Sequence, residues 1–166
     1  MTSRIYTAGL LLHGPAGQAL DDGAVAVSGS AITDVGPRAD VVSRALPGTP
    51  VAHFPGATLL PGLIDTHVHL TFDAGPDPVA SLLAGDDPTL PFAVAGRARQ
   101  LLDHGVTTVR DLGDRGGVVA ALRDAVDRGL LTGPRVLSAG APVTIPGGHC
   151  WFLGGEAKGL DGIREV

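Results

Sequence analysis

Short apolar runs separated by turn residues fill the first 59 positions and predict a set of β-strands. Aliphatic and β-branched side chains alternate with polar ones over a few residues before Gly, Pro or Asp interrupts each run. Gly29-Ser30 is a two-residue hairpin signal, and another turn is expected at residues 13–15. The predicted strands cover residues 4–12, 23–28, 32–36 and 51–54. These hairpins have no helix of their own, so they need another sheet layer or a neighbouring domain to cover their apolar face.

From residue 60 onward the pattern changes to strand, helix, strand. Apolar positions recur at helical spacing in two segments, each of which is followed by a glycine that can end a helix. The predicted strands are 60–70, 106–112 and 135–139, the predicted helices are 91–104 and 118–128, and a further helix starts with Asp161 as N-cap. Residues 71–90 and 140–159 read as long loops rich in Gly and Pro. Strands that alternate with helices in this way are typical of a parallel sheet in an α/β fold.

The first of these strands contains three polar side chains at every second position. Asp65, His67 and His69 are interleaved with Val68 and other apolar residues. In a regular strand all three would point to the same side, with the two histidines roughly 6–7 Å apart along the backbone. Two imidazoles at that spacing can converge on one metal ion.

Composition and charge exclude several classes of function. Of 166 residues, 44% are hydrophobic and 17% are charged, which favours a packed core over disorder. The net charge of −5 comes without a basic patch, which argues against nucleic acid and anionic membranes as partners. The single Cys150 excludes an internal disulfide and fits a reducing compartment. No leader-like segment or long apolar run is evident, so we expect a soluble cytoplasmic protein.

The order of the motifs resembles the amidohydrolase superfamily. A small β-region precedes Pro-Gly-Leu-Ile-Asp-Thr-His-Val-His at residues 61–69. Gly-Val-Thr-Thr-Val-Arg-Asp-Leu-Gly follows at 105–113, Gly-Pro-Arg-Val at 133–136, and Gly-Gly-His at 147–149. Within the superfamily, the chain looks most similar to the imidazolonepropionase-like and Xaa-Pro dipeptidase-like members.

This resemblance implies a metal-dependent hydrolase in which a β-sandwich, here residues 1–59, accompanies a TIM-type (β/α)₈ barrel. Residues 60–166 would form its first three β/α units. His67 and His69 match two ligands of one or two divalent ions, commonly zinc. A water activated by the ion would hydrolyse a C–N bond in a cyclic amide or a dipeptide. His149 matches a substrate-binding histidine, and Asp65 is expected to support the ligands from behind.

Other parts of such a site have no match in this sequence. Similar proteins also need a modified lysine or an acid on a fourth strand, histidines on two later strands, and an aspartate on the eighth as proton acceptor. The only lysine is Lys158, in a predicted loop. We therefore expect an N-terminal portion of an amidohydrolase that is inactive alone and contains no complete catalytic set.

Several further residues have a simpler structural interpretation. Arg110 and Asp111 could line the barrel mouth or form a structural ion pair, and we favour the ion pair. Cys150 has no neighbouring base in the sequence that would make it a nucleophile. Three histidines are expected to serve packing, surface or helix-end roles: His13, His53 and His104.

Two hypotheses of different classes remain open. In the first, the chain is part of an enzyme completed by further chain or by a separate subunit. In the second, it is a non-catalytic remnant that folds in part and associates through its exposed barrel edges, with a complementing chain or with copies of itself.

Overall fold

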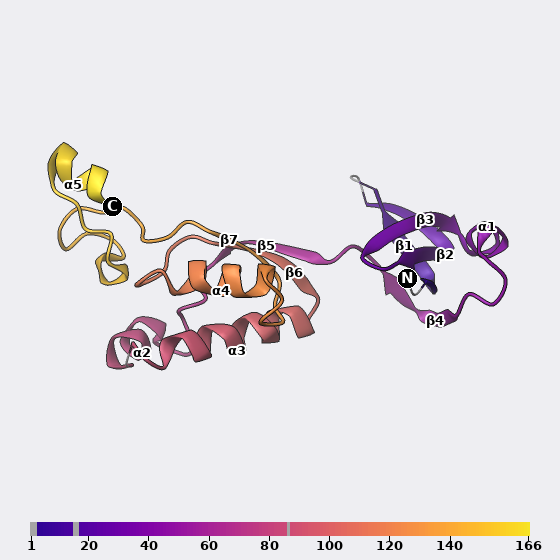
Figure 1. Ribbon diagram of the computed structural model, residues 1–166, viewed down its shortest axis with the longest axis horizontal. Coiled ribbons are helices and arrows are strands. Elements are labelled where there is room, and N and C mark those ends of the chain that lie inside the picture. Colours follow the sequence, from indigo (N-terminus) through magenta and orange to yellow (C-terminus); the bar gives the residue numbers. More distant parts are fainter. Residues whose placement is uncertain (1–2, 15–16, 86) are drawn as a thin grey trace. The chain divides into compact units, whose positions relative to one another are not determined.

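The computed structural model describes residues 3–14, 17–85 and 87–166. Contacts between residues divide the chain into two compact units, Met1–Pro61 and Gly62–Val166. The division falls within the Pro-Gly pair that precedes the His-x-His strand. Strands and helices occur together in the chain, which confirms the predicted mixed α/β fold (Figure 1).

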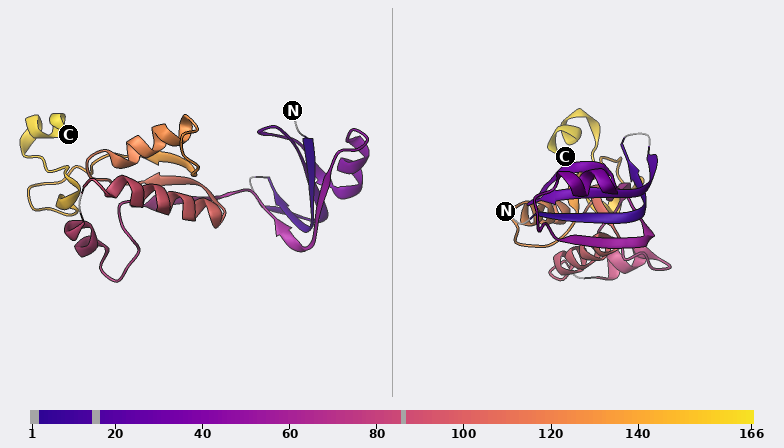
Figure 2. Two further views of the ribbon diagram at one scale, coloured as in Figure 1. Left: turned by 60° about the horizontal axis from the view of Figure 1, so that its bottom comes forward. Right: turned by 90° about the vertical axis from the view of Figure 1, so that its right-hand side faces the viewer.

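The first unit is a four-stranded sheet in the order β3-β2-β1-β4. β1 and β2 are antiparallel, as are β2 and β3, whereas β4 runs parallel to β1. The right-hand view of Figure 2 shows these strands as neighbouring ribbons. The strands are β1 (Ser3–His13), β2 (Gln18–Ser28), β3 (Ala31–Pro37) and β4 (Val51–Leu59). The hairpin at Gly29-Ser30 is confirmed, while Pro15 of the other predicted turn lies outside the described residues.

A short helix in this unit was not expected. α1 (Arg38–Arg44) buries Val41 against Ile5 and Ala24 of the sheet. The prediction that the hairpins have no helix of their own was therefore wrong. One buried valine gives too little periodicity to mark a seven-residue helix in a sequence.

The second unit is built on three parallel strands in the order β5-β6-β7. They are β5 (Leu63–Val68), β6 (Val106–Asp111) and β7 (Arg135–Ser138). The two longer helices are α3 (Leu90–Asp103) and α4 (Val118–Asp127), and they lie on one side of the strands (Figure 1). The strands β6 and β7 and both helices begin or end within two residues of the predicted limits.

One apolar core joins both helices to one face of this sheet. Its buried members come from β6, β7, α3, α4 and the segment after β5: Leu70, Val94, Ala98, Val109, Val118, Val119, Leu122 and Val136. The opposite face has no such cover among the described residues. Leu63, Ile64 and Leu137 are 50%, 66% and 45% exposed there or at the strand ends.

Two local predictions in this unit were wrong. Residues 71–90 are not only a loop, because α2 (Pro78–Ala84) forms within them with Asp77 as its N-cap, accepting a hydrogen bond from the Ala80 N–H. The final helix, α5 (Gly159–Glu165), begins two residues before Asp161, and Lys158 is its N-cap. The helix α2 has seven residues, so its apolar pattern is too short to identify it, whereas α5 was expected and only its start differs.

The assigned core predicts that truncating a buried leucine destabilises the protein more than truncating an exposed one. Leu122→Ala should lower the free energy of unfolding by about 2–5 kcal/mol, because Leu122 is 5% exposed and its removal leaves a cavity. Leu130→Ala, at a leucine that is 65% exposed, should change it by less than about 0.5 kcal/mol. Urea unfolding followed by circular dichroism measures both, and equal losses would contradict the assigned core.

Candidate functional site

His67, near the carboxyl end of β5, and His69, directly after the strand, lie beside one another. The ring centroids of His67 and His69 are 5.6 Å apart, and the ring planes make an angle of 67°, an edge-to-face arrangement. His67 is exposed and His69 is half-buried. The predicted pair is thus brought together.

The pairing of β5 with β6 is irregular beside Asp65. Asp65 is level with Val109 on β6, and Val68 is level with Asp111, so three residue steps on β5 match two on β6. The regular alternation assumed for Asp65, His67 and His69 is therefore interrupted between Asp65 and Val68. That all three side chains share one face stays a prediction.

Asp65 nevertheless contacts the histidine segment through the backbone. Its Oδ1 accepts a hydrogen bond of 3.1 Å from the backbone N–H of His67. This contact holds the main chain at the irregular position of the strand. A supporting role of Asp65 toward the imidazole rings stays a prediction.

The ring of His69 is fixed by a backbone carbonyl. Its Nδ1 lies 2.9 Å from the carbonyl oxygen of Gly113. A carbonyl oxygen can only accept, so Nδ1 must be the protonated nitrogen in this contact. The lone pair of Nε2 is then free to bind a metal ion, which is how metal-ligating histidines are commonly oriented.

Asp111 holds together the segments on either side of that contact. Its carboxylate is fully buried and accepts the N–H groups of Leu70 at 2.7 Å and of Gly113 at 3.0 Å. Burial raises the pKa of the Asp111 carboxyl above its usual value, while the two N–H donors and nearby His69 oppose that shift. Asp111 thus positions the residue after His69 and the carbonyl that His69 contacts.

The predicted ion pair between Arg110 and Asp111 is not formed. Within residues 3–14, 17–85 and 87–166, Arg110 makes no ion pair, and the two oxygens of Asp111 are occupied by backbone donors. The structural role predicted for Asp111 is confirmed, through hydrogen bonds to the main chain. The motif Arg-Asp-Leu-Gly alone could not show which group the carboxylate would meet.

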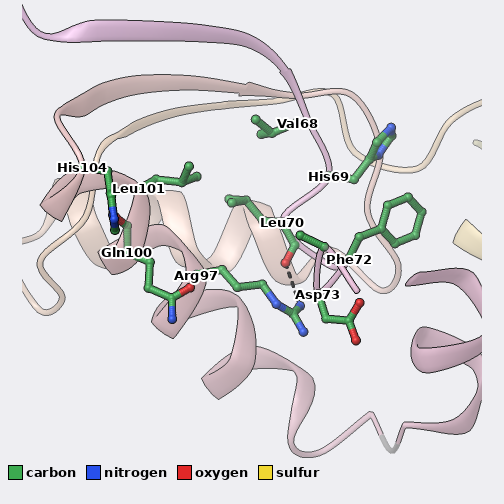
Figure 3. Close-up of a pocket in the computed structure, with 10 residues that line it drawn as sticks. Val68, His69, Leu70, Phe72, Asp73, Arg97, Gln100, Leu101 and His104 are labelled. Carbon is green, nitrogen blue, oxygen red and sulfur yellow. Dashed lines mark hydrogen bonds between the residues drawn. The ribbon is translucent and has the colours of Figure 1, made fainter. Parts of the chain in front are cut away.

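A groove lies beside His69 along the unpaired edge of β5. Its volume is about 370 Å³, and it runs between the segment after β5 and the helix α3. Figure 3 shows His69 and Phe72 at one end and His104 and Gln100 at the other. Between them, the Arg97 guanidinium donates to the carbonyl oxygen of Leu70 at 2.9 Å. Neither Phe72 nor Arg97 belongs to a recognisable motif, so the sequence alone did not single them out.

His149 lies on an ordered turn in the segment after β7. The Gly147 N–H donates to Glu156 Oε1 at 2.5 Å, and the Thr144 N–H donates to the carbonyl oxygen of Gly155 at 2.9 Å. These bonds close the 140–159 segment on itself. His149 is exposed, and among the contacts of the described residues none joins it to His67 or His69. Its role toward a substrate stays a prediction.

The remaining histidines occupy structural positions. His53 Nδ1 lies 2.6 Å from the hydroxyl of Thr7, which is fully buried in the first unit. His104 Nδ1 lies 2.7 Å from the carbonyl oxygen of Gln100 at the end of α3. Both contacts agree with the structural interpretation. His13 is the last residue of β1.

A metal ion would find part of a coordination shell here. Two neutral imidazoles are good donors for zinc and similar ions, and the unprotonated Nε2 that follows from the Nδ1 contact of His69 fits that use. In the part of the chain that the structure describes, however, no group of three or more His, Cys, Asp or Glu side chains could hold a metal. Lys158 precedes a helix and does not lie on a strand of the sheet. His67 and His69 are therefore suitable ligands for a metal ion, but they form only part of a coordination shell.

The amidohydrolase family is the class of protein to which this chain belongs. The sequence profile of that family matches residues 58–165, which include all three parallel strands together with His67 and His69. The ordered motifs that suggested the superfamily thus identify it correctly. Hydrolysis is the chemistry shared by the relatives described next.

Individual relatives extend well beyond this chain. It is 34% identical to ochratoxinase of Aspergillus niger over 168 residues, covering 97% of this chain and 33% of the relative. A Xaa-Pro dipeptidase structure with bound methionine in the active site superimposes with a TM-score of 0.75 at 28% identity, over 93% of this chain and 37% of that one. The structure of phenylurea hydrolase B superimposes with a TM-score of 0.70 at 28% identity, over 85% of this chain and 31% of that one. The chain spans about a third of the length of the ochratoxinase that it matches.

Among the described residues, no helix has both the length and the apolar character needed to cross a bilayer.

Removing one acceptor oxygen from the buried Asp111 carboxylate should destabilise the protein. Asp111→Asn replaces an acceptor oxygen with an amide N–H₂, so either the Leu70 or the Gly113 N–H loses its partner. The unfolding free energy should fall by about 1–3 kcal/mol. Amide hydrogen exchange at Leu70 or Gly113 should accelerate. Asp124→Asn, whose carboxyl is 61% exposed, is the matched control and should leave both amides protected. Unchanged protection in Asp111→Asn would contradict the assigned role.

Proposed function

We propose that this chain forms the β-sandwich portion and the first three β/α units of a metal-dependent amidohydrolase that acts on the C–N bond of a small cyclic amide or dipeptide-like substrate. The single observation that supports this best is the His67–His69 pair, with Nδ1 of His69 bound to a backbone carbonyl and Nε2 free. Membership of the family and the hydrolytic relatives support the same reaction class.

His67 and His69 would hold a divalent ion, with zinc the preferred candidate because imidazole suits it well. When bound, such an ion supplies a Lewis acid that can polarise a carbonyl and lower the pKa of water. The chain's own residues would orient this site. Asp111 and the carbonyl of Gly113 hold the His69 ring, Asp65 holds the main chain at His67, and His149 would contact the substrate.

The open sheet suggests how the site would be completed. β5 and β7 are the edge strands of their sheet, and Leu63, Ile64 and Leu137 on them are about half exposed or more. Unpaired edges with apolar side chains favour pairing with further strands. We propose that later strands, in the same polypeptide or in a complementing chain, supply the remaining ligands and the proton acceptor. The chain alone would then be inactive. Its cytoplasmic location, based on the single cysteine, stays a prediction.

A non-catalytic role is the second candidate. The observation that favours it is the lack of a third metal-binding side chain within the described residues. In that case the same open edges would serve association with a partner or with copies of this chain, and no activity would appear when later strands are supplied.

Metal titration tests the ligand pair directly. The 166-residue protein should bind zinc weakly, and His67→Ala or His69→Ala should weaken binding by more than about tenfold, because loss of a mere orienting partner already costs about 10- to 100-fold. His104→Ala is the matched control, since that histidine lies at the end of α3. Calorimetric titration measures all three. Zinc that stays at one equivalent through dialysis against a chelator would reveal a third ligand and contradict the incomplete set.

Hydrolysis assays test the need for later strands. With zinc or manganese added, the 166-residue protein should hydrolyse cyclic amides and Xaa-Pro dipeptides no faster than background. A chain extended by the remaining barrel strands should show metal-dependent turnover that His69→Ala abolishes. Turnover by the unextended protein would contradict inactivity alone, whereas an inactive extended protein that binds metal would favour the non-catalytic role.

A further inference from the structure

A continuous row of aromatic rings begins at the histidine pair. The His69 and Phe72 ring centroids are 5.1 Å apart, those of Phe72 and Phe152 are 6.2 Å apart, and those of Phe152 and Trp151 are 6.1 Å apart. These separations lie within the range of favourable aromatic contacts. Phe72, Phe152 and Trp151, called the aromatic row below, come from two segments distant in sequence.

The far end of this row is held by a tight turn. Trp151–Leu153 form one turn of 3₁₀-helix, and the N–H groups of Leu153 and Gly154 bond the carbonyls of Cys150 and Trp151 at 2.9 and 3.0 Å. Leu153 is fully buried and anchors the turn. Cys150 adopts a left-handed φ of 59°, which a side chain rarely takes. Such local strain is often found at ligand-binding positions.

A second close contact ties the turn to the histidine segment. A Cβ at Gly113 would lie 3.1 Å from Pro142 and 3.2 Å from the Leu153 side chain. Gly113 is the residue whose carbonyl holds the His69 ring. The absence of a side chain there lets the 140–159 segment approach, so the aromatic row and the histidine pair share one support.

Exposure along the row rises away from its anchor. Leu153 is buried, Phe72 and Phe152 are half-buried, and Trp151 is 48% exposed. Uncharged rings that remain open to water beside candidate metal ligands can stack a further ring, and such stacking adds to the gain from burial. The ring contact between His69 and Phe72 makes this surface continuous with the place where the scissile bond would lie.

We propose that the aromatic row binds an aromatic substituent of the amide substrate while His67 and His69 face the bond to be cleaved. This inference depends on the proposed function for the position of that bond. It narrows the substrate class to amides with an aromatic ring close to the C–N bond, in preference to those with small aliphatic groups.

Trp151 provides the experiment, because it is the only tryptophan of the 166 residues. N-acetyl-L-phenylalanine, added to the zinc-loaded protein, should give a saturable change in Trp151 emission. N-acetyl-L-alanine, which keeps the amide and lacks the ring, should give none. No saturable response to N-acetyl-L-phenylalanine, or equal responses to both probes, would overturn the proposal.

Variants separate the row from the rest of the molecule. By calorimetry, Trp151→Leu and Phe152→Leu should each weaken binding of N-acetyl-L-phenylalanine by about three- to tenfold, the size of one aromatic contact. Phe92→Leu, at a phenylalanine on α3 that is 79% exposed, is the matched control and should not weaken it. Equal affinity in all three variants would overturn the proposal.

Two further outcomes separate a failure of this proposal from a failure of the proposed metal site. Loss of zinc binding in the unaltered protein, together with selective binding of the aromatic probe, would contradict the proposed metal site and support the aromatic row as a binding surface. If Trp151 is shielded from acrylamide quenching and becomes accessible only on dilution of an oligomer, the row is an interface between copies, and the proposal fails.

Discussion

One buried carboxylate determines the geometry around the candidate site. Asp111, at the end of β6, bonds the N–H groups of Leu70 and Gly113, which follow β5 and β6 respectively. A carboxylate removed from water is costly unless donors replace the water, and these two donors do so. Because Gly113 in turn accepts from His69 Nδ1, the same carboxylate orients a ring that it does not touch. The two strand ends, the histidine tautomer and the approach of the 140–159 segment all depend on this arrangement.

The two units show what periodicity can and cannot reveal. Helices α3 and α4 were predicted closely because each buries two or more apolar residues at helical spacing in one core. Helices α1 and α2 were missed, since each buries a single apolar side chain, Val41 or Leu82. The shared face predicted for Asp65, His67 and His69 assumes regular strand alternation, and the register between β5 and β6 shifts between Asp65 and Val68.

Only those residues of the candidate site that belong to short sequence motifs could be predicted. His67 and His69 were found because ligand type and spacing are local properties. The partner of Asp111 was not, because the Leu70 N–H lies 41 residues away in sequence. Phe72 and Trp151 were also outside any motif, and their connection to His69 appears only when the segments after β5 and β7 are placed together. Tertiary contacts of this kind leave no pattern in one sequence.

The central claim is that backbone contacts orient His69 so that Nε2 is available to a metal ion, and its ring nitrogens can be observed directly. Long-range ¹H–¹⁵N correlation spectra of the histidine rings should show His69 with its proton on Nδ1, and addition of zinc should shift the Nε2 resonance while the proton stays on Nδ1. A His69 ring that carries its proton on Nε2, or whose nitrogen resonances do not respond to zinc, would contradict the account.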